Sequence, residues 1–256
     1  MIFVLGYKGF VGGGIYEYFQ KEGLDLAGID VDNYQDFVGK KCDIFINANG
    51  NSKKYLAEEQ PLVDFELSVT SVLKTFLDFQ FKKYIYISSI DVYNRQDGDE
   101  YTKETAIIEV ENLSNYGFHK YLAENLVRHY CKDWLIVRLA GMIGPNMKKG
   151  PVYDIINERK LWVSSKSRFL TLSTYEVARA LIKLFNVKQE IYNIVASDNI
   201  ELQEVAKIFD KKIVEEGDKI LIYKVNCEKI NKVLKMPTSL ECIKEFQKIC
   251  SSAGNQ

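Results

Sequence analysis

A tyrosine and a lysine four residues apart, Tyr116 and Lys120, stand in the segment SNYGFHKYLAE at residues 114–124. Four residues make slightly more than one helical turn, so both side chains would lie on the same face of a helix. A lysine ammonium beside a phenol favours the phenolate, which can take a proton from a hydroxyl group. The chain contains 16 tyrosines, however, and about two such pairs are expected by chance. The pair therefore gains meaning only from its neighbours.

Three glycines, Gly6, Gly9 and Gly12, follow the apolar segment at residues 2–5 and open a stretch with helical character. Glycine lets a backbone turn tightly and approach a pyrophosphate, and the N-terminus of a helix attracts that anion. The pattern therefore predicts a dinucleotide-binding turn. A plain glycine-rich connection from strand to helix is the alternative.

Asp30 ends the next apolar segment, 18 residues beyond Gly12. A carboxylate about 20 residues after the glycines binds the ribose hydroxyl groups of a dinucleotide and repels a 2′-phosphate. We therefore predict NAD as the cofactor, with NADP as the alternative because Lys8 lies in the turn. Asp32 is a rival for this role, and an ordinary solvated loop aspartate is a second alternative.

A pair of serines, Ser88 and Ser89, ends the apolar segment YIYISS. Ligands of a parallel sheet bind beyond the carboxyl ends of its strands, where the helix carrying Tyr116 would also begin. In this arrangement Ser89 donates a hydrogen bond to a substrate oxygen while Tyr116 exchanges a proton. Lys120 and a positively charged nicotinamide ring would lower the pKa of the phenol, which is about 10 in a free tyrosine.

The elements that must position these residues follow from the alternation of apolar and amphipathic segments. Short apolar segments predict buried strands, and segments with apolar residues at helical spacing predict helices that cover a sheet. The expected strands lie at residues 2–5, 24–30, 42–50, 82–93 and 134–141, and the expected helices at 10–23, 61–80 and 115–130. This alternation is typical of an α/β fold with a doubly wound parallel sheet.

The alternation becomes less regular after about residue 146. We predict a dinucleotide-binding domain at residues 1–145 and a smaller mixed lobe at residues 146–256. Within the lobe, residues 174–196 combine a helical and a strand-like segment and are expected to pack back on the sheet. The other elements expected in the lobe are helices at 202–209 and 240–250 and a strand at 219–226.

Composition limits the classes of function. The 256 residues carry a formal net charge of −1 and are 46% hydrophobic, which suffices for a core but lacks the basic character of nucleic-acid-binding proteins. No apolar run approaches the roughly 20 residues that cross a bilayer, and we expect no signal peptide. Five scattered cysteines indicate reduced thiols and a cytoplasmic location. With only two histidines, a histidine-rich metal site is excluded, and no metal is expected.

Considered together, the motifs resemble the extended short-chain dehydrogenase/reductase family, particularly its nucleotide-sugar epimerases, dehydratases and 4-ketoreductases. The matching segments occur in the family order and include GYKGFVG, DIFINANG, YIYISSIDVY, SNYGFHKYLAE, WLIVRLAGMIGP and EIYNIVA. The resemblance implies a Rossmann fold with a C-terminal substrate lobe and an NAD-dependent reaction on a sugar. It also implies a homodimer, because members often associate through two helices, including the one that bears Tyr116.

The resemblance assigns roles to individual residues. The catalytic residues would be Ser89, four residues before Tyr93, together with Tyr116 and Lys120. Asp91 occupies a position where some members carry a second acid or base, with a loop-capping carboxylate as the alternative. The residues that the resemblance places at the cofactor are Gly6, Gly9, Phe10, Val11, Gly12, Asp30, Asn47, Ala48, Asn49, Ser88, Tyr116 and Lys120.

The chain departs from the family where the diphosphate of a nucleotide sugar would bind. Gly141 stands in place of one asparagine, and Ser68 stands in place of another on the long helix. Substrate contacts are therefore expected from Ser89, from the position of Gly141 and from Arg168. The lysines of NMKKG, residues 146–150, are further candidates, with a charged surface loop as the alternative.

Three hypotheses for function follow. The first is an NAD(P)-dependent epimerase that oxidises a hydroxyl group of a nucleotide-linked sugar and then reduces the ketone. The second is an NAD(P)H-dependent 4-keto-sugar reductase, which releases oxidised cofactor in every turnover. The third is a dinucleotide-binding sensor or scaffold without turnover, a class whose members tend to lose the tyrosine or the lysine. The expected partner is a small-molecule substrate, with no nucleic acid and no membrane.

Overall fold

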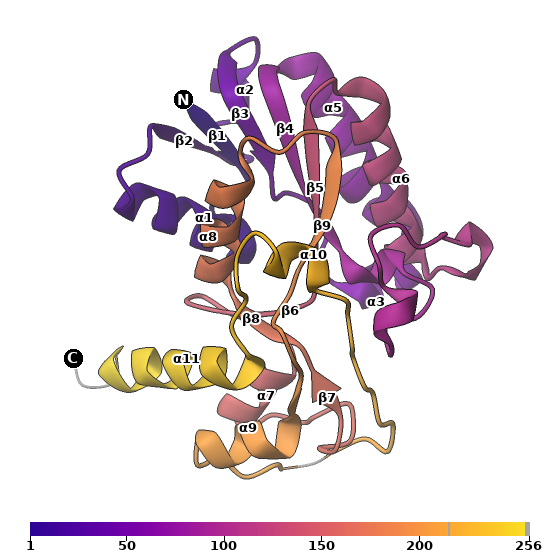
Figure 1. Cartoon of the computed structure of the whole chain (residues 1–256), viewed down its shortest axis with the longest axis vertical. Helices are drawn as coiled ribbons and strands as arrows, with labels where there is room; N and C mark the ends of the chain where they lie inside the picture. The colour runs from indigo at the N-terminus through magenta and orange to yellow at the C-terminus, as the bar shows by residue number, and fades with distance from the viewer. Residues whose placement is uncertain (215, 254–256) are drawn as a thin grey trace.

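Six parallel strands form the central sheet of the computed structural model, which describes residues 1–214 and 216–253 (Figure 1). In sheet order they are β2 (Leu26–Ile29), β1 (Ile2–Leu5), β3 (Lys41–Asn47), β4 (Gln80–Ser89), β5 (Trp134–Leu139) and β9 (Glu190–Ile194). Every neighbouring pair is parallel. The expected doubly wound parallel sheet is therefore confirmed, and its strand order reverses between β1 and β3.

Helices cover both faces of this sheet, as Figure 1 shows. They are α1 (Phe10–Lys21) and α8 (Thr174–Leu184) on one face, and α5 (Ser71–Asp78) and α6 (Asn115–Tyr130) on the other. All four residues of β1 are buried, because a strand covered on both faces must be apolar throughout. The core accordingly has two large apolar clusters, one containing Phe19 of α1 and the other containing Val127 of α6.

The segment expected as one helix over residues 61–80 contains a change of helix type. It consists of α4 (Pro61–Phe65), a π-helical turn (Glu66–Thr70) and α5. A π turn adds a residue to the helical repeat and re-aims the side chains around it, often at functional sites. Shorter elements before and after it are α2 (Tyr34–Phe37), α3 (Lys54–Glu59) and 3₁₀ turns at Ile90–Val92, Asp99–Tyr101 and Val110–Asn112.

The C-terminal part of the chain lies below the carboxyl ends of the strands in Figure 1, apart from α8 and β9, which belong to the sheet layers, and α10, which packs beside β9. Its elements are β6 (Gly141–Ile143), α7 (Pro151–Ile156), β7 (Arg168–Phe169), β8 (Thr171–Ser173), β10 (Ile200–Glu201), α9 (Leu202–Ile208), α10 (Glu228–Asn231) and α11 (Ser239–Ala253). Two small sheets form here, parallel β6–β8 and antiparallel β7–β10. Residues 219–226, expected as a strand, are extended but pair only through isolated bridges. None of the helices in the described ranges is both long and apolar enough to cross a membrane.

Candidate active site

The glycine turn between β1 and α1 has a bare backbone. Gly6 has a φ of +83°, a conformation that glycine adopts without strain. A Cβ atom on Gly12 would lie 2.2 Å from the carbonyl oxygen of Gly6, so a side chain there would fill the turn. A backbone left open in this way, at the start of a helix, fits the pyrophosphate of a dinucleotide.

Asp30 stands at the carboxyl end of β2, next to the glycine turn. Its Oδ2 accepts a hydrogen bond of 3.2 Å from the backbone nitrogen of Lys8. The Lys8 ammonium pairs instead with Asp32, at 2.5 Å. The Lys8 ammonium is therefore not paired with the Asp30 carboxylate, and a carboxylate beside the turn fits ribose hydroxyl groups better than a 2′-phosphate.

The segment after β3 connects the glycine turn to the predicted catalytic residues. The side chain of Asn47 is fully buried, where it donates to the Tyr84 hydroxyl at 2.7 Å and accepts from the backbone nitrogen of Asn49 at 2.9 Å. A Cβ on Gly6 would lie 3.1 Å from the backbone of Ala48 and Asn49. Any contact of Asn47 with a cofactor would therefore come through the shape that it gives this segment.

Tyr116, Ser89 and Lys120 lie together, which the spacing of the motifs led us to expect. All three are buried, with exposed fractions of 8%, 8% and 6%. Ser89 lies near enough to lower the pKa of the Tyr116 phenol, and the Lys120 Nζ lies 6.0 Å from the centre of the Tyr116 ring. A Cβ on Gly50 would lie 3.4 Å from the Lys120 Nζ, so the segment after β3 borders this trio.

Gly117 explains how the helix reaches the strand end, and sequence reasoning missed it. A Cβ at this position would lie only 2.1 Å from the carbonyl oxygen of Asp91. The Ser114 hydroxyl caps α6 by accepting a hydrogen bond of 3.2 Å from the Gly117 nitrogen. The signal in the sequence was a glycine inside a helix, where it normally costs stability.

The pKa of the Tyr116 phenol is raised in the structure, whereas the sequence analysis expected it to be lowered. Burial raises the pKa of Tyr116, the charge of Asp91 raises it further, and the nearby Ser89 hydroxyl lowers it only in part. Burial also lowers the pKa of Lys120 to about 8, although the charges of Asp64, Glu124 and Asp91 oppose this shift. In the protein alone, loss of hydration therefore outweighs the attraction between the phenolate and the ammonium.

Asp91 is joined to the trio through Ser89. The Ser89 hydroxyl donates to Asp91 Oδ2 at 2.8 Å, and the Asp91 backbone nitrogen donates back to Ser89 Oγ at 3.2 Å. The other carboxylate oxygen, Oδ1, accepts from the Lys54 Nζ at 2.6 Å. Lys54 opens α3 and was not among the expected residues, because nothing in a sequence reveals a contact across 37 positions.

Ser88, the neighbouring serine, faces a different partner. Its hydroxyl donates to Glu124 Oε1 at 2.6 Å. Arg138 donates to both oxygens of the same carboxylate, at 3.0 and 2.7 Å, and both side chains are buried. This cluster ties β4, β5 and α6 together one helical turn beyond Lys120.

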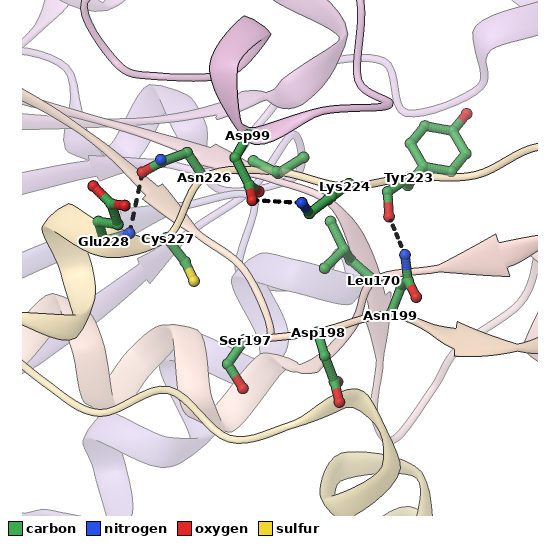
Figure 2. A pocket seen from close by; sticks show the side chains of 11 residues that line it. Asp99, Leu170, Ser197, Asp198, Asn199, Tyr223, Lys224, Asn226, Cys227 and Glu228 are labelled. Atoms are coloured by element: carbon green, nitrogen blue, oxygen red, sulfur yellow. Dashed lines mark hydrogen bonds and ion pairs between the residues drawn. The ribbon is translucent and has the colours of Figure 1, made fainter.

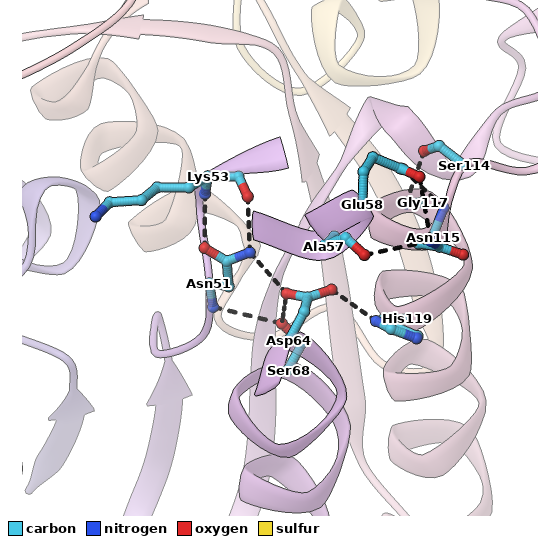
Figure 3. A network of polar contacts seen from close by, with 10 residues as sticks. All are labelled: Asn51, Lys53, Ala57, Glu58, Asp64, Ser68, Ser114, Asn115, Gly117 and His119. Carbon is cyan, nitrogen blue, oxygen red and sulfur yellow. Dashed lines mark hydrogen bonds and ion pairs between the residues drawn. The ribbon is translucent and has the colours of Figure 1, made fainter. Parts of the chain in front are cut away.

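A second buried carboxylate, Asp64 of α4, organises the polar network in Figure 3. It accepts hydrogen bonds from Asn51 at 2.7 Å, from Ser68 at 3.1 Å and shares one of 2.6 Å with His119 Nδ1. These partners come from the segment after β3, from the π turn and from α6. Asp64 therefore links three elements around Lys120, and Ser68 is one of its partners.

Two further expected residues lie on the side of the C-terminal lobe. A Cβ on Gly141 would lie 2.4 Å from the carbonyl oxygen of Leu170, so the close packing of β6 requires glycine here. Arg168 donates to Asn199 at 2.9 Å and pairs with Glu201 at 3.3 Å. Its guanidinium is thus engaged with the start of β10, and the structure does not bring it to the trio.

Asn199 also lines the cavity shown in Figure 2, which has a volume of about 380 Å³. Its wall includes the ion pair between Lys224 and Asp99, at 2.8 Å, and the hydrogen bond from Asn199 to the Tyr223 carbonyl oxygen, at 2.7 Å. None of the trio lines it. Asp99 in its wall lies outside residues 146–256, so both parts of the chain line the cavity.

The loop at residues 146–150 reaches the segment after β3. The Lys149 ammonium donates to the Ser52 carbonyl oxygen. Loss of hydration, and then the like charges of Lys53 and Lys54, lower the pKa of Lys149 to about 8, although the residue keeps an exposed outer surface. Three ammonium groups therefore lie near one another at this end of the site, those of Lys53, Lys54 and Lys149. Asp91 is the ion-pair partner of Lys54.

Comparison with known proteins places this geometry in context. A model of the NAD dependent epimerase/dehydratase family matches residues 2–194. No curated protein sequence matches the chain. Among solved structures, MoeE5 in complex with UDP-glucuronic acid and NAD is 14% identical, with a TM-score of 0.81 over 97% of this chain and 99% of that chain.

Two other solved structures have the same fold. A UDP-glucose 4-epimerase with UDP-glucose, from the hyperthermophilic eubacterium Thermotoga maritima, is 16% identical, with a TM-score of 0.79 over 98% of this chain and 99% of that chain. A UDP-galactose 4-epimerase is 20% identical, with a TM-score of 0.78 over 98% and 99% of the two chains. At these identities the likeness concerns the fold.

Proposed function

Because the chain belongs to the NAD dependent epimerase/dehydratase family, we propose that it is a sugar epimerase, which oxidises one hydroxyl group and reduces the resulting ketone from the opposite face. The observation that carries this proposal is that Ser89, Tyr116 and Lys120 lie close together and are all buried. Family membership confirms the resemblance that the motifs indicated. Lys120 also borders the segment after β3, which packs against the glycine turn.

NAD is the cofactor of this family. The glycines of the turn, Gly6, Gly9 and Gly12, would hold its pyrophosphate, because their backbone is open. The Asp30 carboxylate would bind its ribose hydroxyl groups. Bound NAD would accept a hydride from the substrate carbon and later return it. The contribution of the protein is to hold the sugar and to move protons.

Ser89 and Tyr116 would act on the oxygen of the reacting hydroxyl group. The phenol exchanges the proton of that hydroxyl, and the Ser89 hydroxyl orients its oxygen. With a pKa of about 8, Lys120 is mostly protonated at neutral pH, and its charge stabilises negative charge that develops on the phenol oxygen. A tyrosine and a lysine kept together in a buried site argue against a sensor without turnover.

We propose a nucleotide-linked sugar as the substrate. MoeE5 and the Thermotoga maritima epimerase were solved with such sugars. The ammonium of Lys149 lies across from the segment after β3, where it would meet a phosphate of the substrate. Arg168 is the weaker candidate for this contact because Asn199 and Glu201 already engage it.

Incubation with UDP-glucose, UDP-galactose and UDP-glucuronic acid tests the reaction, with the sugars resolved by NMR. An epimerase converts one of them to its epimer without net consumption of NAD or NADH. Stoichiometric loss of NADH or NADPH with a keto-sugar would identify a reductase instead, which is the second hypothesis.

A Tyr116→Phe variant tests the assignment of the phenol. We expect turnover to fall by about 100-fold to 10,000-fold, because the proton-exchanging group is removed, while NAD binding stays normal. Tyr130→Phe is the matched control, since Tyr130 is on the same helix and 50% exposed. Turnover of the Tyr116→Phe variant close to that of the wild type would contradict the assignment.

We also propose a homodimer in the cytoplasm. Large apolar side chains are exposed along α4, the π turn, α5 and the end of α6: Leu62, Val63, Phe65, Leu67, Leu77 and Tyr130. A second copy of the chain would cover them. All five cysteines are free, which suits a reducing compartment. Light scattering of the purified protein measures the oligomeric state.

A further inference from the structure

We propose that the ring of Tyr86 is a positioning group for Lys120: it holds the lysine ammonium over its face, beside Tyr116, and keeps that ammonium charged in a buried slot. The inference rests on the proposed function, because the charge of Lys120 matters to the reaction only if Tyr116 exchanges a proton with the substrate. It adds to the site a residue that no motif of the sequence indicates.

Tyr86 lies on β4, on the same face of the strand as Tyr84 and Ser88, because side chains two residues apart share a face. The helix α6 covers this face, as the hydrogen bond from Ser88 to Glu124 shows. Tyr86 is fully buried there. The Lys120 Nζ lies over its ring, 5.4 Å from the ring centre, which is within the range of a cation–π contact.

The slot that holds the ammonium has three walls. The ring of Tyr86 is the first, and the ring of Tyr116, 6.0 Å from the Lys120 Nζ, is the second. The third is the bare backbone at Gly50, where a Cβ atom would lie only 3.4 Å from the Nζ. The rings come from β4 and from α6, so the ammonium joins the strand to the helix that carries Tyr116.

The ammonium in this slot has no direct anionic partner. Within the described parts of the chain, no hydrogen bond or ion pair engages it, and Asp64 of α4, Glu124 of α6 and Asp91 after β4 act on it only as neighbouring charges. Burial outweighs them and lowers the pKa of Lys120 to about 8. An aromatic face carries partial negative charge, and its attraction for a cation grows when water is excluded. The Tyr86 ring therefore supplies stabilisation that no carboxylate gives at contact distance.

The hydroxyl group of Tyr86 is not part of this role. It is buried and has no hydrogen-bond partner among the residues that the structure describes. The hydroxyl of Tyr84, which is equally buried on the same face, engages Asn47 and Thr75, both at 2.7 Å. Burial raises the pKa of Tyr86 well above its ordinary value, so the phenol stays neutral. The ring is thus the part of Tyr86 that serves Lys120.

The ring contact bears on the pH range of the reaction. Lys120 must carry its proton to stabilise negative charge on the Tyr116 oxygen, so activity should fall as the pH rises through the pKa of the lysine. Loss of the cation–π attraction would lower that pKa by about 1 pH unit, which would leave about half of the lysines uncharged at pH 7. Tyr86 therefore extends the activity to higher pH.

The first test changes the electrons of the ring and keeps its shape. Tyr86→Phe retains the negative face, whereas trifluorophenylalanine at position 86 has nearly the same size but fluorine atoms that withdraw electron density from that face. Lysine side chains are labelled with ¹³C at Cε and titrated by NMR without substrate, and the signal that disappears in Lys120→Met is assigned to Lys120. We expect Tyr86→Phe to titrate as the wild type does, and the fluorinated protein to titrate about 0.5–1 pH unit lower.

Position 84 provides the matched control. Tyr84 has the same exposed fraction as Tyr86, 0%, and lies on the same strand and face. No contact between its ring and the Lys120 ammonium is found in the described ranges. Phenylalanine and trifluorophenylalanine at position 84 should therefore give the same Lys120 midpoint. Equal midpoints for the two substitutions at position 86, or a higher midpoint with the fluorinated ring, would overturn the proposal.

The second test is the pH–rate profile of the same proteins. With the fluorinated ring at position 86, the basic limb should move to lower pH by the shift that NMR measures, while turnover at lower pH stays within about threefold of that of Tyr86→Phe. A purely structural role of Tyr86 would lower turnover equally at every pH, and this result, or an unmoved basic limb, would overturn the proposal. Failure of the proposed function appears elsewhere, as normal turnover in Tyr116→Phe, and leaves the NMR titration interpretable.

Discussion

Ser88 and Ser89 are neighbours in the chain, and each donates a hydrogen bond to a carboxylate that is paired with a cation. The cluster of Ser88, Glu124 and Arg138 is buried, and the guanidinium binds both carboxylate oxygens. The cluster of Ser89 and Asp91 ends in Lys54, whose side chain is 56% exposed and binds one oxygen. The same three types of group therefore form a buried cluster in one place and a partly exposed cluster in the other.

The difference lies in hydration and geometry. A guanidinium has a rigid planar shape that can bind both oxygens of a carboxylate, whereas an ammonium is a single point of charge on a flexible stem. Burial of Glu124 and Arg138 makes their separation costly. In the other cluster, the Lys54 side chain is exposed to water and makes a single contact with Asp91.

The two clusters should differ most in how much they contribute to the free energy of unfolding. Arg138→Met leaves the Glu124 charge buried without its partner, and we expect it to lower the free energy of unfolding by about 3–5 kcal/mol. Lys54→Met removes a partly exposed pair and should cost less than about 1 kcal/mol. Urea unfolding monitored by circular dichroism measures both. Equal losses in the two variants would mean that the clusters do not differ as described.

Lys120 is a buried cation without the bidentate pairing of Arg138. Its removal should therefore raise the free energy of unfolding at neutral pH, whereas removal of Arg138 should lower it. Its pKa of about 8 in the folded protein lies below the 10.5 of an ordinary lysine, so between these pH values the unfolded chain binds more protons than the folded one. Stability from this group therefore rises with pH from about 8 to 10.5, and its charge costs about 3 kcal/mol below pH 8.

Lys120→Met removes this cost. We expect the variant to be more stable than the wild type at pH 7, to lose turnover, and to lose its advantage as the pH approaches 10.5. Urea unfolding at several pH values gives the difference between the two proteins. A variant less stable than the wild type at pH 7 would show that Lys120 is effectively paired.

The smallest expected effect separates the two serines. Ser89→Ala should lower turnover by about 100-fold and leave the free energy of unfolding nearly unchanged. Ser88→Ala should lower that free energy by about 1–3 kcal/mol, since a buried carboxylate oxygen loses a donor, and should affect turnover far less. Steady-state rates and urea unfolding on both variants test the contrast. If the same serine variant had the larger loss both of turnover and of free energy of unfolding, the contrast between the two serines would be refuted.

Local patterns were sufficient to predict the sheet and the position of the trio. Apolar runs such as residues 2–5 and 84–87 need no partner to be recognised, and parallel strands bring their carboxyl ends to one edge. The spacing of Tyr116 and Lys120 likewise follows from one helical turn. These features depend on neighbours in the sequence.

The features that sequence analysis missed depend on contacts between distant positions. The ion pair of Lys54 with Asp91 and the hydrogen bond of Asp64 with His119 each join separate elements. The π turn that holds Ser68 interrupts a segment whose apolar spacing looks like one continuous helix. The direction of the Tyr116 pKa depends on burial, which no local pattern gives. The division into two domains near residue 145 stays a prediction.

The late position of β9 in the chain has a consequence for biosynthesis. The edge of β5 is completed only by residues 190–194, so it stays open while the ribosome adds the intervening 50 residues or so. An open strand edge can pair with another nascent chain. Asn193 on that strand also accepts the hydrogen bond of the Tyr93 hydroxyl, at 2.8 Å, just past the turn that carries Asp91. The sheet is therefore complete beyond β5 only after residues 190–194 have been synthesised.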